Sequence, residues 1–259
     1  MTLRQLNGSC FGVSGAVAIA LASLLLGCSG QSYNCGPGAP PCTTTDQHCY
    51  GIVDWTGSPT GFSMELTAVA LTPGDGFIDD EGWLLYYPGS IVGMSWVEAG
   101  EINEGGSTGF STDYFWAVGT NWCTSDQYFM FYDLGPVAQS DLNNNTWIAY
   151  KINQDSTTPS TWNVTISYAQ GGQVLFNEAA TDNPMTPNTV QEGQELQGTN
   201  SAEAPYAFFG YNAFYQGSTK SFWTTDGSVS SGNPPHAGWW PSSKPSQTSN
   251  GGLFFTWCC

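Results

Sequence analysis

Short runs of alternating apolar and polar residues, separated by Gly, Pro, Asn and Asp, cover most of the chain after residue 50. Trp162, Val164 and Ile166, for example, alternate with polar residues. Such alternation is typical of half-buried β-strands, and no stretch of this region has a sustained helical period. Strands are expected at Phe62–Ala70, Gly82–Tyr87, Ile91–Ile102, Asp113–Val118, Gln127–Asp133, Thr146–Asn153, Trp162–Tyr168, Gln173–Ala179, Val190–Gln197, Ala204–Tyr215, Phe222–Thr224 and Gly252–Trp257.

An antiparallel β-sandwich requires strands with one buried face and one solvent-exposed face. Residues 143–145 (Asn-Asn-Asn) and 171–172 (Gly-Gly) are expected to form hairpin turns. The 11 Trp, 12 Tyr and 14 Phe residues supply enough apolar area for one core. The sequence therefore predicts an all-β sandwich domain over residues 50–259.

The first residues have a different pattern. Arg4 is the only cation before an apolar run, Val13 to Leu26, which is followed by Gly27 and Cys28. This is typical of a secretory signal peptide, and its end resembles the lipobox of bacterial lipoproteins. The resemblance implies that residues 1–27 are removed and that Cys28 is lipidated. We expect an exported protein anchored to the cell envelope by lipid alone, at the cell surface or outer membrane.

Charge restricts the partners. Of four basic residues, Arg4 lies in the predicted leader, which leaves Lys151, Lys220 and Lys244 against 21 acidic residues. Phosphate binding needs clustered Lys and Arg, so nucleic acid is excluded as a partner. With so few basic groups, protonation at low pH produces little positive charge, and we expect the fold to tolerate acid.

Cysteines mark both ends of the expected domain. Residues 28–49 form a Gly-, Pro- and Thr-rich tether that carries cysteines. An even number of cysteines in an exported chain predicts disulfides that staple the termini, with the connectivity left open. Their spacing matches no zinc motif, so no metal is expected. They are Cys35, Cys42, Cys49, Cys123, Cys258 and Cys259.

Two acidic strands are candidates for chemistry. Glu98 shares one face of its strand with Trp96 and Ile102, where desolvation would raise its pKa and suit it to acid–base work. A second strand carries Glu192 and Glu195, and their spacing does not decide which would join Glu98. These carboxylates could also be solvated structural residues at strand ends or edges.

A third acidic segment spans residues 75–81. Its hard oxygen ligands Asp75, Asp79, Asp80 and Glu81 could hold Ca²⁺. The segment does not match an EF-hand, and a solvated acidic turn is the favoured interpretation. No cofactor is therefore expected.

The order of several elements resembles the eqolisin-type and neprosin-type glutamic peptidases. They are Trp83, the stretch 98–100, the aromatic stretch 114–116, and Glu192 or Glu195 followed by residues 207–210. The resemblance implies a jelly-roll sandwich related to concanavalin A-like lectins. It assigns Glu98 with Glu192 or Glu195 as the catalytic pair of an acid-acting endopeptidase, and Trp83, Trp96, Tyr114 and Trp116 as substrate-binding residues.

Two other functions stay open. The same face could bind a glycan or a peptide without catalysis, as a lectin-like module, or the protein could be a structural component of the cell surface. The expected partner is accordingly a polypeptide or a glycan.

Overall fold

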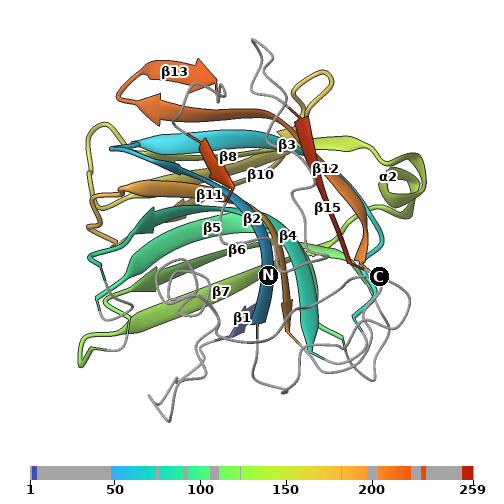
Figure 1. Ribbon diagram of the computed structural model, residues 1–259, viewed down its shortest axis with the longest axis horizontal. Coiled ribbons are helices and arrows are strands. Elements are labelled where there is room, and N and C mark those ends of the chain that lie inside the picture. The colour runs from blue at the N-terminus through green and yellow to red at the C-terminus, as the bar shows by residue number, and fades with distance from the viewer. Residues whose placement is uncertain are drawn as a thin grey trace.

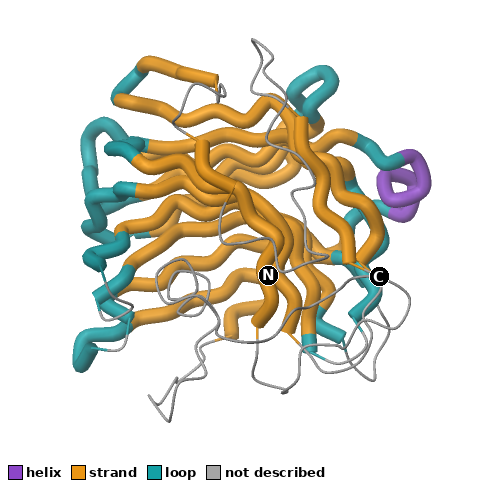
Figure 2. The backbone as a smooth tube through the Cα atoms, viewed as in Figure 1, coloured by secondary structure: helices purple, strands orange, loops and turns teal. Residues whose placement is uncertain are grey.

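The computed structural model describes residues 2–4, 48–73, 76–89, 93–105, 111–122, 124–181, 183–197, 204–222, 229–231 and 253–258. Most of these residues lie in strands, and two antiparallel sheets pack face to face (Figures 1 and 2). The predicted all-β sandwich is confirmed.

The larger sheet has eight strands and contains the candidate site. In spatial order they are β1 (Thr2–Arg4), β7 (Tyr128–Pro136), β6 (Asp113–Thr120), β5 (Ser95–Asn103), β4 (Phe77–Tyr86), β11 (Thr189–Gln197), β2 (His48–Thr56) and β14 (Val229–Ser231). β11 lies between β4 and β2, from which it is distant in sequence. This long crossover brings the two predicted acidic strands, β5 and β11, to either side of β4.

The second sheet has seven strands. In spatial order they are β10 (Val174–Ala180), β9 (Trp162–Tyr168), β8 (Trp147–Gln154), β3 (Gly61–Thr67), β12 (Ala204–Gln216) and β13 (Thr219–Phe222), and β15 (Leu253–Cys258) also pairs with β12. In β8, Tyr150 is buried and its neighbour Lys151 is partly exposed, which is the alternation that the sequence predicts. This sheet covers one face of the larger one.

The core lies between the sheets. Val97 and Trp116 of the larger sheet and Tyr150 and Val164 of the second belong to one continuous buried cluster. Tyr150 and Val164 come from strands with alternating burial, whereas β5 and β6 are buried on both faces. Burial of side chains of this size stabilises the fold by about 1.5–3 kcal/mol each.

One of the two predicted turns is confirmed and the other is wrong. Gly171 and Gly172, with φ of 85° and 65°, connect β9 to β10. Residues 143–145 are not a hairpin turn, because Gln139–Asn144 form the helix α2 and Asn145 ends it with φ 47°. An Asn in the left-handed conformation ends a helix as readily as it makes a turn, so the composition alone did not distinguish them.

The strand boundaries also differ in places. The acidic segment 77–81, expected as a solvated turn, is the first half of β4. It is paired on one side with β5 and on the other with β11, which buries its backbone. β2 begins at His48, inside the predicted tether. The run of acidic residues masked the first half of β4 in the sequence.

The N-terminal predictions stay untested. Cys28, Cys35, Cys42, Cys123 and Cys259 lie outside the described residues, and Cys49 and Cys258 are described only as backbone in β2 and β15. β1, within the predicted leader, pairs with the edge of β7, so cleavage of the leader would leave β7 at the edge of the sheet. In the described part of the chain, no helix is both long and apolar enough to span a bilayer.

Candidate functional site

β4, β5 and β11 form the centre of the larger sheet, and each presents alternate residues to its two faces. One face packs on the second sheet through residues such as Leu84, Val97 and Val190. We call the opposite face, which carries Trp83, Glu98 and the residues in register with them, the distal face. A separate apolar cluster around Trp83 confirms that it is distinct from the core.

Glu98 lies among aromatic residues on the distal face. It pairs across the strands with Trp83, which in turn pairs with Gln191 of β11. Trp96, two residues before Glu98 on β5, is buried on the same face. The predicted placement of Glu98 and Trp96 on one face of their strand is thus what the structure shows. The neighbouring position of Trp83 comes from the pairing of β4 with β5.

Three more carboxylates lie on the distal face beside this group. In register, Glu81 of β4 lies between Gly100 of β5 and Gly193 of β11, and Asp79 lies beside Glu195. A Cβ on Gly100 would come within 2.5 Å of the Glu81 Cβ, so this strand contact requires glycine. Both neighbours of Glu81 in register therefore lack side chains, although all three residues are buried.

The surroundings of Glu98 favour its protonated form. Burial, and after it the nearby carboxyl of Glu195, raise the pKa of the Glu98 carboxyl to about 8. The indole groups of Trp96 and Trp83 offset part of this rise in pKa. The Trp96 indole N–H is buried and forms no hydrogen bond. Glu98 therefore holds its proton at neutral pH and can act as an acid.

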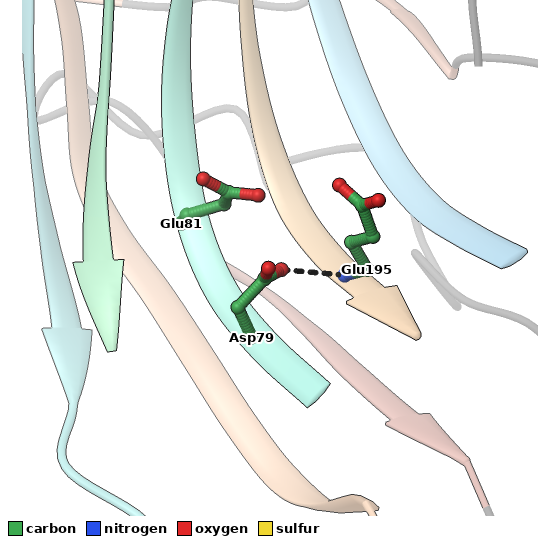
Figure 3. A group of neighbouring side chains, drawn as sticks. All are labelled: Asp79, Glu81 and Glu195. Carbon is green, nitrogen blue, oxygen red and sulfur yellow. Dashed lines mark hydrogen bonds between the residues drawn. The ribbon is translucent and has the colours of Figure 1, made fainter. Parts of the chain in front are cut away.

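Asp79, Glu81 and Glu195 converge, each with one carboxylate oxygen within 4.8 Å of the others (Figure 3). All three are buried, and the backbone N–H of Glu195 donates a hydrogen bond of 3.2 Å to Asp79 Oδ1. Burial, followed by the neighbouring carboxylates, raises the pKa of Asp79 and of Glu81 well above the usual range. Three oxygen donors at this spacing are a ligand set that a hard divalent cation could use.

This set differs from the Ca²⁺ ligands considered from the sequence. Asp79 and Glu81 belong to it, but Asp80 points to the other face, where the Gln194 side chain donates a hydrogen bond of 2.8 Å to its Oδ1. Asp75 lies outside the described residues. The four predicted ligands therefore do not form one site, and the expectation that no cofactor is bound stays a prediction.

Three predicted site residues are not on the distal face. Glu192 is fully buried and pairs in register with Gly82, whose Cα faces Phe62 of the second sheet. The Glu192 side chain therefore points into the sandwich and not towards Glu98. Tyr114 and Trp116 belong to the core between the sheets. The reason is that successive side chains of a strand point to opposite faces. Each of the three residues lies an odd number of positions along its strand from the residue in register with Glu98, so its side chain points to the other face. Of the two glutamates on β11, the structure brings Glu195 to the face of Glu98.

The interior also holds carboxyl groups. Glu101 is fully buried, and the Tyr150 hydroxyl of the second sheet donates a hydrogen bond of 2.9 Å to its Oε1. The backbone N–H of Val69 donates to the other oxygen at 3.4 Å. Both oxygens of Glu192 lack a hydrogen-bond partner. Desolvation raises the pKa of Glu101 and Glu192 well above the usual range, so both are neutral in the fold.

The interior hydrogen bond gives one prediction. We expect Tyr150→Phe to lower the free energy of unfolding by about 1–3 kcal/mol, because it removes the hydroxyl that satisfies a buried carboxyl group. Tyr168→Phe is the matched control. Its hydroxyl donates at 3.0 Å to Asp141 at a partly exposed position, so its loss should cost less. Urea unfolding of the two variants measures the difference, and equal effects would contradict the prediction.

Sequence reasoning named Asp79 and Glu81 only as possible Ca²⁺ ligands and did not place them on the same face as Glu98. The signal was present in the sequence, because Asp79, Glu81 and Trp83 alternate with Asp80, Gly82 and Leu84 at the period of a strand. The run of acidic residues at positions 79–81 concealed this alternation. Trp122 and Phe129, which pack beside Trp96 on the same face, come from later segments and had no local signal.

Comparisons with known proteins support the fold. No family model matches the sequence, and no curated protein matches it either. The crystal structure of scytalido-glutamic peptidase with a transition state analog inhibitor matches with a TM-score of 0.50 and 10% sequence identity. The match covers 81% of this chain and 98% of that chain. At this identity the likeness is one of fold, a two-sheet antiparallel sandwich.

Two further solved structures match with lower TM-scores. SCP-B, a member of the eqolisin family of peptidases, in a complex with the tripeptide Ala-Ile-His, matches with a TM-score of 0.48 and 10% identity, covering 81% of this chain and 98% of that one. The legume lectin-like domain from Entamoeba histolytica matches with a TM-score of 0.36 and 13% identity, covering 63% and 76%.

Proposed function

We propose that the distal face is the active site of an acid-acting endopeptidase in which Glu98 and Glu195 are the catalytic pair. The observation that carries the proposal is that two buried carboxyl groups from separate strands share this face and interact electrostatically. Two carboxyl groups that interact on one face of a site are suited to complementary acid and base roles. Gly100 and Gly193, which carry no side chain, lie between their rows on this face, and glycine within a strand often marks a site where another backbone approaches closely.

The roles follow from the environments. Glu98, whose pKa is raised to about 8, carries a proton and donates it to the carbonyl oxygen of the substrate. Glu195, as a carboxylate, removes a proton from a water molecule while the water oxygen bonds to the carbonyl carbon. The C–N bond then breaks as the amide nitrogen takes the proton from Glu195, and Glu98 recovers its own. Water is thereby added across the peptide bond.

The direct test is an assay of the purified protein on an acid-denatured protein substrate at about pH 4. We expect new N-termini to appear at a rate that does not change with a chelator or with reagents that modify serine or cysteine, because the proposed chemistry uses none of these. Activity that disappears with the chelator would instead assign the carboxylates on this face to a metal.

We also propose that the protein is exported and anchored through Cys28. The motif Leu25-Leu26-Gly27-Cys28 supports this. In a bacterial host, the wild-type chain should fractionate with membranes and incorporate a labelled fatty acid, and Cys28→Ser should lose both properties. Cys10→Ser, in the predicted leader, is the control. A soluble wild-type chain that starts at Met1 would contradict this proposal.

A further inference from the structure

An aromatic cluster lies beside Glu98 on the distal face. Trp96 packs edge-on against Trp122 with ring centroids 5.3 Å apart and contacts Phe129 at 5.9 Å, and the centroids of Trp122 and Phe129 are 6.2 Å apart. Trp96 is buried, whereas Trp122 and Phe129 are only partly buried. We call these three side chains the aromatic shelf.

The backbone around the shelf holds it in place. Gly119 of β6 pairs with Trp96, and a Cβ there would come within 2.2 Å of the indole ring, so the ring lies over this glycine and reaches towards β7. Trp122 is fixed by two backbone hydrogen bonds: its N–H donates to Met94 at 2.9 Å, and its carbonyl accepts from Gly93 at 2.8 Å. The shelf is therefore formed before any ligand arrives, which reduces the entropy cost of binding.

The chemistry of the shelf selects its occupant. None of its three side chains is charged. The indole N–H groups of Trp96 and Trp122 are both buried, so neither can donate to the hydroxyl groups of a sugar. A partly exposed aromatic surface with no accessible polar group favours an apolar side chain, and its burial contributes about 25 cal/mol per Å² of apolar area. This favours a polypeptide over a glycan.

The position of the shelf determines how far its occupant would lie from Glu98. Trp96 and Glu98 lie two residues apart on one face of β5, which is about 7 Å along the strand. An extended peptide advances by a similar distance in two residues. The partly exposed rings lie further away, because Phe129 is two strands from Trp96, about 10 Å across the sheet. A side chain seated on the shelf would therefore come from a position within about four residues of a peptide bond held at Glu98.

We propose that the aromatic shelf binds a bulky apolar side chain of a polypeptide substrate, within about four residues of the bond that is cleaved. This inference rests on the proposed peptidase function and names its substrate class: polypeptides with Phe, Leu or a similar residue near the cleavage point. The shelf residues determine specificity, and the bond-breaking steps belong to Glu98 and Glu195.

The test compares otherwise identical peptides that carry Phe, Leu, Ala or Asp at each position around one cleavable bond. We expect kcat/KM to be about 10- to 100-fold higher with Phe or Leu than with Ala at one position, a discrimination typical of apolar pockets. Trp122→Ala and Phe129→Ala should abolish most of this preference, because kcat/KM for the Phe and Leu peptides should fall towards that for the Ala peptide. Tyr128→Ala, on the same strand as Phe129 but exposed, is the matched control.

Binding of the same peptides, measured by calorimetry alongside an oligosaccharide, separates the two proposals. Phe-dependent binding that Phe129→Ala weakens, without any cleavage, would support the shelf and overturn the peptidase. Cleavage with no preference among the four residues, or a preference that both shelf variants retain, would overturn the shelf alone. Binding of the oligosaccharide in place of the peptides, or of neither, would overturn both.

Discussion

Glu195→Gln is expected to lower kcat/KM on a denatured protein substrate by about 10²–10⁴-fold, because it removes the carboxylate that accepts the water proton. The amide keeps nearly the same shape and still occupies the position beside Asp79. The decrease should therefore appear in kcat rather than in KM. Initial rates of N-terminus formation at about pH 4, measured over a range of substrate concentrations, provide both constants.

Glu192→Gln is the control for this experiment. It lies on the same strand, three residues away, but it points into the sandwich and has no hydrogen-bond partner. We expect this variant to retain full activity. The pair of variants also decides which of the two glutamates joins Glu98, a choice that the sequence left open. If Glu192→Gln is inactive although folded and Glu195→Gln is active, the assignment is wrong.

Glu98 needs two substitutions because an amide can replace part of its role. Glu98→Ala removes both the proton and the polar group, and we expect it to abolish measurable cleavage. Glu98→Gln keeps a hydrogen-bond donor for the carbonyl oxygen but transfers no proton, so it should retain a small part of the activity. In the wild type, activity should fall as the pH rises through about 8, where Glu98 loses its proton. That decrease should be absent from the residual activity of Glu98→Gln.

The sequence was sufficient for the architecture because alternation is local. The strand around Trp162 and the one around Tyr150 each show which residues face the core, and the structure agrees. The same rule correctly placed Glu98 with Trp96. Where it failed, polar residues occupied buried positions: in β4, Asp79 and Asp80 are both buried on opposite faces, and no composition rule predicts a buried acid.

The choice between Glu192 and Glu195 could not be made from sequence. It depends on the register between β11 and β4, strands that are far apart in the chain, and a shift of one residue would exchange the two faces. The aromatic shelf was hidden for a similar reason. Trp122 and Phe129 reach Trp96 only because β5, β6 and β7 are neighbours in the sheet.

The second large effect concerns stability: the free energy of unfolding should fall by several kcal/mol as the pH rises from about 4.5 to about 8. Burial raises the pKa of Glu98 to about 8 in the fold, from an ordinary value of 4.5. Below 4.5 the carboxyl is protonated in both states, and its contribution is fully present. Between the two values only the unfolded chain releases the proton, so each pH unit favours unfolding by about 1.4 kcal/mol per group.

Glu101 and Glu192 act in the same direction, because desolvation raises the pKa of each well above 4.5. Asp155 acts in the opposite direction, since hydrogen bonds from Thr157 and Thr158 lower its pKa to about 2. Its contribution is lost only as the pH falls from its ordinary value of 3.8 towards 2, below the range of the others. The scarcity of basic residues limits charge repulsion at low pH, so the fold should be most stable in mild acid.

Chemical denaturation at a series of pH values measures this slope directly. Glu98→Gln removes one titrating group without changing the size of the side chain, so its unfolding free energy should decrease less steeply above pH 4.5 by the contribution of one group. Glu178→Gln, at a partly exposed position of β10, should leave the slope as it is in the wild type. A wild-type stability that is constant or rises between pH 5 and pH 8 would mean that the carboxyls ionise within the fold at their ordinary values. The acid role of Glu98 at neutral pH would then have no physical basis.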